Sequence, residues 1–280
     1  MIHSPITPVL NTGGRAVSLA LVVFFLLLQP ASAQIMIEQG KVIHKVSPGE
    51  TVVNTLNVHN TSKTETLRLK AYWNDFMYVE PYDGTKEFTP AGTSEYSCGS
   101  WVSFSPQEFT MEPLSSKKIS YSVQSPATAR GGYYGVLFLE EGGGKTQGYV
   151  AVNIVTRVGA LFFIETDNRK KAARIENLRP AGPASVQGEY ANEGDVISIP
   201  DGIYYILDGG GLVADRGTVK KFYLPPAKKV SFDVPFSSEL KPGQYTMVLT
   251  FDLGDGDSVV KEMDFSKSRD ATIRILKTRD

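Results

Sequence analysis

The sequence predicts an all-β protein with two tandem β-sandwich domains that follow a cleaved signal peptide. In Lys117–Glu140, apolar side chains first occupy every second position, which is typical of a strand with one buried face, and a nearly wholly apolar strand follows after a turn. Lys228–Phe251 repeats this pattern without a gap, and no stretch shows a sustained helical period. Self-similarity of this length indicates two copies of one β-domain, although two amphipathic hairpins can also match by chance. We expect each segment to fold as a hairpin.

Residues 1–33 are predicted to be a signal peptide. Arg15 is the only charged residue in this segment, the mostly apolar run Ala16–Leu28 follows it, and Ala31–Ala33 reads Ala-Ser-Ala. This is the order of a basic region, a short hydrophobic region and a cleavage site. The run is shorter than the roughly 20 residues that a membrane-spanning helix needs. We expect an exported chain, periplasmic or extracellular, with no transmembrane segment after cleavage; a retained N-terminal anchor is the alternative.

The first domain is expected over residues 34–166. Its predicted strands, in chain order, are Ile35–Val46, Val52–Asn60, Leu67–Trp73, Trp101–Phe104, the two strands of the first hairpin, and a long strand Tyr149–Ile164. Residues 74–100 are polar, carry Gly and Pro, and lack periodicity, so we expect them to form an irregular insertion.

The second domain is expected over residues 172–280. The short, charged segment Thr166–Ala173 is the best candidate for a linker. After it come predicted strands at Arg174–Leu178 and Ser185–Asn192, and hairpin turns at Asp208-Gly209 and Gly254–Asp257. The number and spacing of the strands fit two sandwiches.

Composition excludes several classes of function. The chain has 280 residues, of which 41% are hydrophobic and 10% aromatic, so it can fill real cores. Its net charge of −1, without a basic block, argues against a nucleic-acid partner. Cys98 is the single cysteine in the sequence, so no disulfide framework supports the fold.

The sequence contains no recognisable catalytic set. His44 and His59 lack partners at a metal-binding spacing. Asp252, Asp255 and Asp257 crowd one turn but do not have the spacing of a calcium loop. We therefore expect a non-enzymatic protein with no catalytic residues, no metal and no cofactor.

Five segments carry a resemblance to a known family. They are Pro48–Glu50 (PGE), Asn60–Lys63 (NTSK), Ala71–Asp75 (AYWND), Ser105–Pro113 (SPQEFTMEP) and Gly131–Phe138 (GGYYGVLF). Together with the signal peptide and the two sandwiches, they resemble periplasmic pilus (fimbrial) assembly chaperones. The resemblance covers residues 35–165 best, and it implies that both domains are immunoglobulin-like.

The resemblance implies a partner, a secreted or surface protein subunit that is bound by β-strand addition. In this family a long strand at the end of the first domain donates alternating apolar side chains, and a basic pair in the cleft between the domains anchors the subunit's terminal carboxylate. The donor strand would be Tyr149–Ile164, and its apolar contacts would be Val150, Val152 and Ile154.

The basic pair is incomplete in this sequence. The family's anchor arginine falls at Lys41 and its anchor lysine at Gly159, so carboxylate anchoring is expected to be weakened. Arg157 is expected to replace the lysine only if the strand presents its other face. The predicted partner-binding residues are thus Lys41, Val150, Val152, Ile154 and Arg157.

A second candidate surface lies at the insertion. Tyr72, Phe76, Tyr78 and Tyr82 lie in or beside residues 74–100, where the sequence pattern does not require burial. Exposed, they would suit a cell-wall or glycan-associated adhesion or structural module, which is the alternative function. Packing of these rings against the protein's own fold is the competing interpretation.

Overall fold

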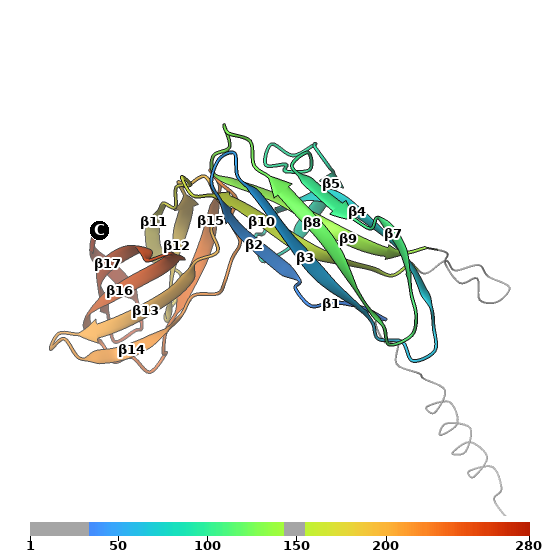
Figure 1. Cartoon of the computed structure of the whole chain (residues 1–280). Helices are drawn as coiled ribbons and strands as arrows, with labels where there is room; N and C mark the ends of the chain where they lie inside the picture. Colours follow the sequence, from blue (N-terminus) through green and yellow to red (C-terminus); the bar gives the residue numbers. More distant parts are fainter. Residues whose placement is uncertain (1–33, 143–154) are drawn as a thin grey trace, which may run out of the picture. The chain divides into compact units, whose positions relative to one another are not determined.

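The structure, a computed structural model, describes residues 34–142 and 155–280, and these ranges contain strands and turns but no helix. Residues Ile35–Asp280 form one compact unit built from four sheets. Figure 1 shows the strands of residues 35–166, blue to yellow, and those of residues 173–279, yellow to red, as two sandwiches. The predicted signal peptide, residues 1–33, lies outside the described residues.

The first sandwich contains ten strands in two sheets. They are β1 (Ile35–Ile37), β2 (Lys41–Val46), β3 (Thr51–Asn60), β4 (Leu67–Tyr78), β5 (Lys86–Pro90), β6 (Val102–Ser105), β7 (Glu108–Met111), β8 (Ser116–Gln124), β9 (Gly132–Glu141) and β10 (Arg157–Thr166). One sheet has the order β1-β3-β8-β6, and the other has the order β2-β10-β9-β4-β5, with β7 also paired to β4.

The second sandwich contains eight strands. They are β11 (Ala173–Pro180), β12 (Ser185–Asn192), β13 (Asp201–Asp208), β14 (Val213–Thr218), β15 (Lys229–Pro235), β16 (Gly243–Gly254), β17 (Asp257–Lys267) and β18 (Ile273–Arg279). Its sheets have the orders β11-β12-β15 and β14-β13-β16-β17-β18. The predicted linker therefore joins β10 of the first sandwich to β11 of the second, and the all-β two-sandwich fold class is confirmed.

The alternation predicted for β8 is present. Ile119, Tyr121 and Val123 are buried in the core of the first sandwich, whereas Lys118 and Ser120 are exposed. Each apolar side chain of this size stabilises the fold by about 1.5–3 kcal/mol when it leaves water completely. The core is thus built from the inward phase of each strand.

The predicted hairpins are wrong. β8 pairs with β3 and β6, whereas β9 pairs with β4 and β10 in the opposite sheet. The same division separates β15, which pairs with β12, from β16, which pairs with β13 and β17. Lys117–Glu140 and Lys228–Phe251 therefore each cross from one sheet to the other. The reason is that β8 and β15 pair with strands that are distant in sequence. The two similar segments also have the same topology, since both cross from one sheet of their sandwich to the other.

The hairpin turns predicted from Gly and Asp residues are correct. β13 pairs with β14 across Asp208-Gly209, and β16 pairs with β17 across Gly254–Asp257. In the latter turn Asp255 has φ 60° and Gly254 and Gly256 have φ 80° and 90°, the left-handed conformation that such tight turns require.

The insertion is more regular than predicted. β4 continues to Tyr78, and residues of the predicted irregular segment form β5, which pairs antiparallel with β4. The outward face of this extension and of β9 carries a third apolar cluster, which is separate from the two sandwich cores: Phe76, Tyr78, Tyr134, Val136, Phe138, Phe163 and Ile197. β9 is apolar on both faces because it separates this cluster from the core.

The chain changes sheets near its start. β1 pairs with β3 in one sheet, and after Gly40 the next strand, β2, pairs in parallel with β10 in the other sheet. The change leaves β2 beside only part of β10, and this arrangement creates the candidate site.

Candidate functional site

In the part of the chain that the structure describes, the first residues of β10 pair with a strand on one side only. β9 pairs with β10 from Arg157 to Glu165, but β2 begins to pair on the other side only at Leu161. The N–H of Leu161 donates to the carbonyl of Gly40 on the β2 side, at 3.0 Å. Because main-chain groups alternate in direction along a strand, Arg157 and Gly159 also direct their N–H and C=O groups to this side. Within the described residues no strand pairs with them there.

Lys41 lies at the point along β10 where pairing with β2 begins. It is the first residue of β2 and lies opposite Leu161. Its Nζ lies 4.3 Å from the centroid of the Phe163 ring, within cation–π range. Partial burial against this ring lowers the pKa of the Lys41 ammonium, and the nearby Glu165 carboxylate opposes that shift.

Lys41 opens into a cavity between the two sandwiches. The cavity has a volume of about 260 Å³, and its walls carry Ile43, Phe163 and Glu165 from the first sandwich and Ile199, Asp201 and Asp252 from the second. Its lining combines apolar side chains with charged side chains of both signs.

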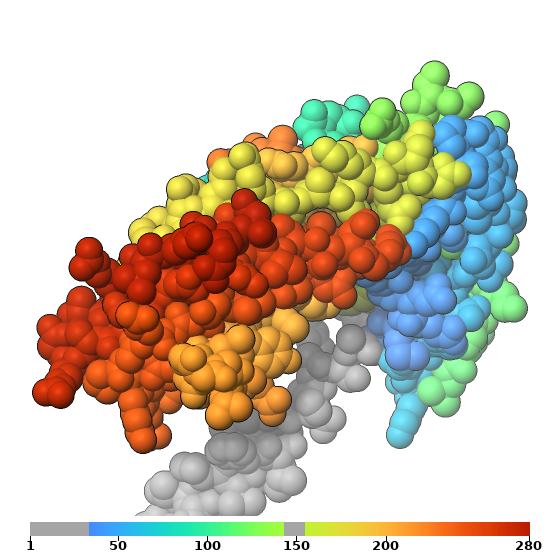
Figure 2. Space-filling view, turned by 90° about the vertical axis from the view of Figure 1, so that its left-hand side faces the viewer, coloured from blue at the N-terminus to red at the C-terminus, as the bar shows by residue number. Residues whose placement is uncertain are grey.

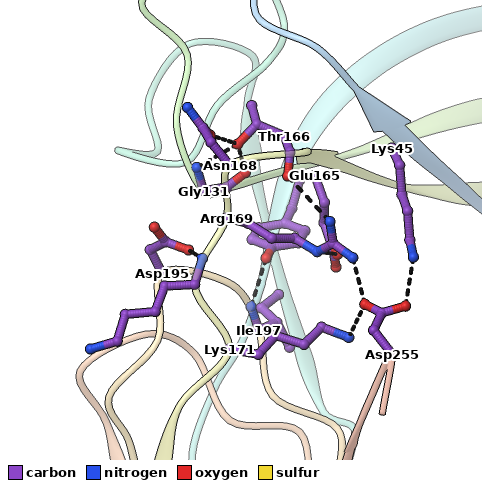
Figure 3. Close-up of polar contacts among 12 residues, drawn as sticks. Lys45, Gly131, Glu165, Thr166, Asn168, Arg169, Lys171, Asp195, Ile197 and Asp255 are labelled. Carbon is purple, nitrogen blue, oxygen red and sulfur yellow. Dashed lines mark hydrogen bonds and ion pairs between the residues drawn. The ribbon is translucent and has the colours of Figure 1, made fainter. Parts of the chain in front are cut away.

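One side of this cavity is closed by a charge cluster centred on Asp255 in the β16–β17 turn. Asp255 pairs with Lys45 at 2.6 Å, with Arg169 at 2.5 Å and with Lys171 at 3.0 Å, and Arg169 also pairs with Glu165 at 2.8 Å (Figure 3). The hydrogen bond from Lys45, followed by those from Lys171 and Arg169, holds the pKa of Asp255 well below its usual range. In Figure 2 the orange-red surface of the second sandwich meets the blue surface of the first. The Lys45–Asp255 ion pair joins these two sandwiches.

Backbone bonds add to this junction. The hydroxyl of Tyr134 accepts a hydrogen bond from the N–H of Ile197 at 2.6 Å, and the N–H of Gly132 donates to the carbonyl of Asp195 at 2.9 Å. The buried hydroxyl of Thr166 bonds to the main chain of Gly131 (Figure 3). Burial is the main cause that raises the pKa of Tyr134, so this phenol stays protonated and in place.

Arg157 and Gly159 share the outward face of β10, so the expectation that Arg157 needs the opposite face is wrong. The guanidinium of Arg157 lies 4.2 Å from the centroid of the Phe138 ring, and a Cβ on Gly159 would approach the same ring at 2.8 Å. Arg157 also donates to the hydroxyl of Tyr72, which in turn donates to Glu140. Arg157 is therefore held on the sheet face, away from Lys41, and does not complete a basic pair with it.

The remaining predicted partner-binding residues, Val150, Val152 and Ile154, lie outside the described residues. The phase of the described part of the strand is nevertheless defined. Val158, Ala160, Phe162 and Ile164 pack in or against the core of the first sandwich, and the odd-numbered residues face outward.

The second candidate surface is not an exposed aromatic platform, and this expectation is corrected. Phe76, Tyr78 and Tyr82 are 1%, 4% and 7% exposed, and Tyr72 is partly buried beside Phe138. Burial, with a smaller effect of Tyr223, raises the pKa of Tyr78 to about 12. The rings are buried because the third cluster and the second sandwich cover them, which the insertion's local sequence does not reveal.

Sequence reasoning missed the residues that form the junction. In the sequence Asp255 is one of three acids in a turn, whereas in the structure it pairs with cations from distant segments. The sequence feature that points to this cluster is the positive charge of Lys45 and of the predicted linker. No motif spacing connects these segments to Asp255. Within residues 34–142 and 155–280, no group of three or more His, Cys, Asp or Glu side chains is placed to hold a metal.

No protein-family model matches the chain, and no curated protein matches it by sequence. Solved structures do match it. A chain from a chaperone–tip adhesin complex of CFA/I fimbriae and the class 5 fimbriae chaperone CfaA each match with a TM-score of 0.50 and 14% identity, over 81% of this chain and 97% of theirs. The chain therefore has the two-domain β-sandwich fold of fimbrial chaperones. No helix in the part of the chain that the structure describes is long and apolar enough to cross a membrane.

Proposed function

We propose that this protein is an exported, non-enzymatic envelope chaperone that binds a protein subunit by β-strand addition. The observation that carries the proposal is the first part of β10, where, among the described strands, none pairs with Arg157 and Gly159 on the side that faces β2 farther along. An incoming strand placed there would continue the line of β2 and gain main-chain hydrogen bonds.

The end of that strand would meet Lys41 at the mouth of the cavity between the sandwiches. Lys41 supplies one ammonium, and Arg157 is engaged with Phe138 and Tyr72. A single point charge attracts a terminal carboxylate without the planar fork that an arginine offers. Capture in this protein therefore depends more on strand pairing and apolar side chains than on the carboxylate.

The apolar contribution is proposed to come from Val150, Val152 and Ile154. Their even numbers share the phase of Val158 and Ala160, which pack against or in the core. In a strand of unbroken phase they would face the core of a captured subunit. Two structures of the same fold are described as a fimbriae chaperone and a chaperone–tip adhesin complex, which supports a surface subunit as the partner. The predicted signal peptide supports a periplasmic site of action.

The proposal is tested by blocking this side of β10. A tagged chain is expressed in its own host, the bound proteins are cross-linked, pulled down and identified, and the yield of the wild-type partner is compared between variants. Arg157→Pro removes an edge N–H that does not pair with β9, and it also blocks the approach of a strand. Arg157→Ala removes the same side chain but keeps the N–H.

We expect Arg157→Ala to recover the partner nearly as wild type does and Arg157→Pro to lose it by about tenfold or more, as expected when main-chain bonds are lost. Circular dichroism checks that both variants stay folded. A folded Arg157→Pro variant that captures the partner at the wild-type level would rule out strand addition at this edge.

A further inference from the structure

One turn of the first sandwich contributes a side chain to the core of the second. The turn between β4 and β5 carries Tyr82, whose side chain is 7% exposed and belongs to the apolar core of the second sandwich. Phe222 and Phe232 of the second sandwich line the same hollow as Tyr82. Tyr82 is thus an anchor supplied by one sandwich to the other.

Neighbouring contacts hold this turn at Tyr223, in the segment between β14 and β15. The carbonyl of Tyr82 accepts a hydrogen bond from the N–H of Tyr223 at 2.8 Å. The ring of Tyr223 stacks on Tyr78 with 4.7 Å between centroids, and Gly84 lies so close that a Cβ there would be 3.3 Å from the Tyr223 ring. Backbone, ring stacking and close packing therefore converge on one residue of the second sandwich.

The backbone of Tyr82 is also unusual. Its φ is 62°, in the left-handed region that side-chain-bearing residues rarely adopt. Such a conformation persists only where the surroundings compensate for it, and burial of the ring in the second sandwich supplies that compensation. A turn without this contact would be better served by glycine or asparagine.

We propose that the β4–β5 turn is a clasp, with Tyr82 as a positioning residue that fixes the orientation of the two sandwiches and hence the cleft at Lys41. One set of contacts between the sandwiches comprises the Asp255 cluster and the hydrogen bonds Tyr134–Ile197 and Gly132–Asp195, the clasp at Tyr223 is another, and the two sets share no residue. Contacts at two separate places restrict the rotation of one sandwich relative to the other more than contacts at a single place would. The fixed orientation does not depend on any partner; its effect on capture rests on the proposed function.

The orientation is measured by pulsed electron paramagnetic resonance on the full chain. Spin labels are attached at Val53→Cys in β3 and Leu276→Cys in β18, both exposed positions. Cys98 is fully buried and burial raises the pKa of its thiol, so it stays unlabelled. Tyr82→Gly removes the ring while relieving the left-handed backbone, and Tyr82→Phe keeps the ring.

Leu114→Gly is the matched control, because Leu114 has φ 56° but is exposed. We expect one narrow distance distribution in the labelled parent, in Tyr82→Phe and in Leu114→Gly, and a broadened distribution in Tyr82→Gly. Tyr223→Leu keeps the main-chain donor and loses the stacking, so it should broaden the distribution less. If Tyr82→Gly fails to fold, Tyr223→Leu decides the question.

Folded variants that retain the narrow distribution would overturn the clasp. The yield of the cross-linked partner gives a second readout. A broadened distribution with full capture would overturn the positioning role of Tyr82 at the cleft and leave strand addition intact. Loss of capture in Arg157→Pro with a narrow distribution, by contrast, supports strand addition without involving the clasp.

Discussion

The side chains of Val136 and Phe138 fill the space into which a side chain at position 159 would project. A Cβ at this position would lie 2.7 Å from Val136 Cγ2 and 2.8 Å from two atoms of the Phe138 ring. The absence of a lysine here is therefore a matter of packing as well as of charge. The outward sheet face needs a residue without a side chain at this point so that Arg157 and Phe138 can stack beside it.

This packing leads to a prediction for Gly159→Ala. The added methyl group must displace Val136 or Phe138, and we expect the free energy of unfolding to fall by about 1–3 kcal/mol. Gly40→Ala is the control, since a Cβ at this position would meet no atom within 4 Å apart from its chain neighbours, and the stability of this variant should change little. Urea unfolding measures both variants, and equal stabilities would contradict the packing argument.

Of the predicted binding residues that the structure describes, Lys41 is the one that lines the cavity between the sandwiches. Because it supplies a single charge to a carboxylate, we expect Lys41→Ala to lower partner capture by about two- to fivefold rather than abolish it. Lys41→Arg should restore capture. Complete loss in Lys41→Ala would show that the carboxylate is the main determinant after all.

At the scale of single elements, the sequence predicts which face of a strand is buried but not which strands pair. The alternation of Ile119, Tyr121 and Val123 fixed one face of β8, and the Asp and Gly residues of the later turns located two true hairpins. Period-2 alternation does not say which strand lies alongside, so β8 and β9 were predicted to pair although they lie in opposite sheets. The burial of Tyr82 was equally inaccessible, because its partners, Tyr223 among them, come from the other sandwich.

The donor-strand hypothesis concerns one element and gives its own prediction. Ile154 lies outside the described residues, and its assignment rests on sequence phase alone. We expect Ile154→Arg to abolish partner capture while the chain stays folded, because a charge would replace an apolar group in the captured subunit's core. Normal capture by this variant, or its unfolding, would exclude Ile154 from the binding strand and leave the Arg157–Gly159 edge as the candidate.

At the scale of the whole molecule, we predict that the two domains fold separately when the chain is divided at the predicted linker. Residues 34–166 and 172–280, produced alone, should each unfold cooperatively with β-type circular dichroism, since each half has its own core. Relative to the whole chain, we expect the free energy of unfolding to fall more for residues 172–280 than for residues 34–166, because the second sandwich loses the Tyr82 ring from its core. If neither half folds alone, the two sandwiches form a single cooperative unit.

We predict that the Asp255 cluster makes the stability of the protein sensitive to acid. The pKa of Asp255 is held below its ordinary value by Lys45 first, then by Lys171 and Arg169. A carboxyl group with a depressed folded-state pKa stabilises the fold fully above its unfolded pKa of about 3.9, and this contribution is lost as the pH falls toward the folded value. Asp255→Asn removes the contribution at every pH.

The wild type should therefore be more stable than Asp255→Asn at about pH 7, and the difference should shrink as the pH falls from about 4 to about 2. Urea unfolding across this range measures the difference. Asp257→Asn, an exposed acid in the same turn, is the control and should behave as wild type at each pH. Because Asp255 is itself partly exposed, added salt should reduce the difference at neutral pH as well. A difference that stays constant from neutral to acid would mean that the charge of Asp255 does not hold the two sandwiches together.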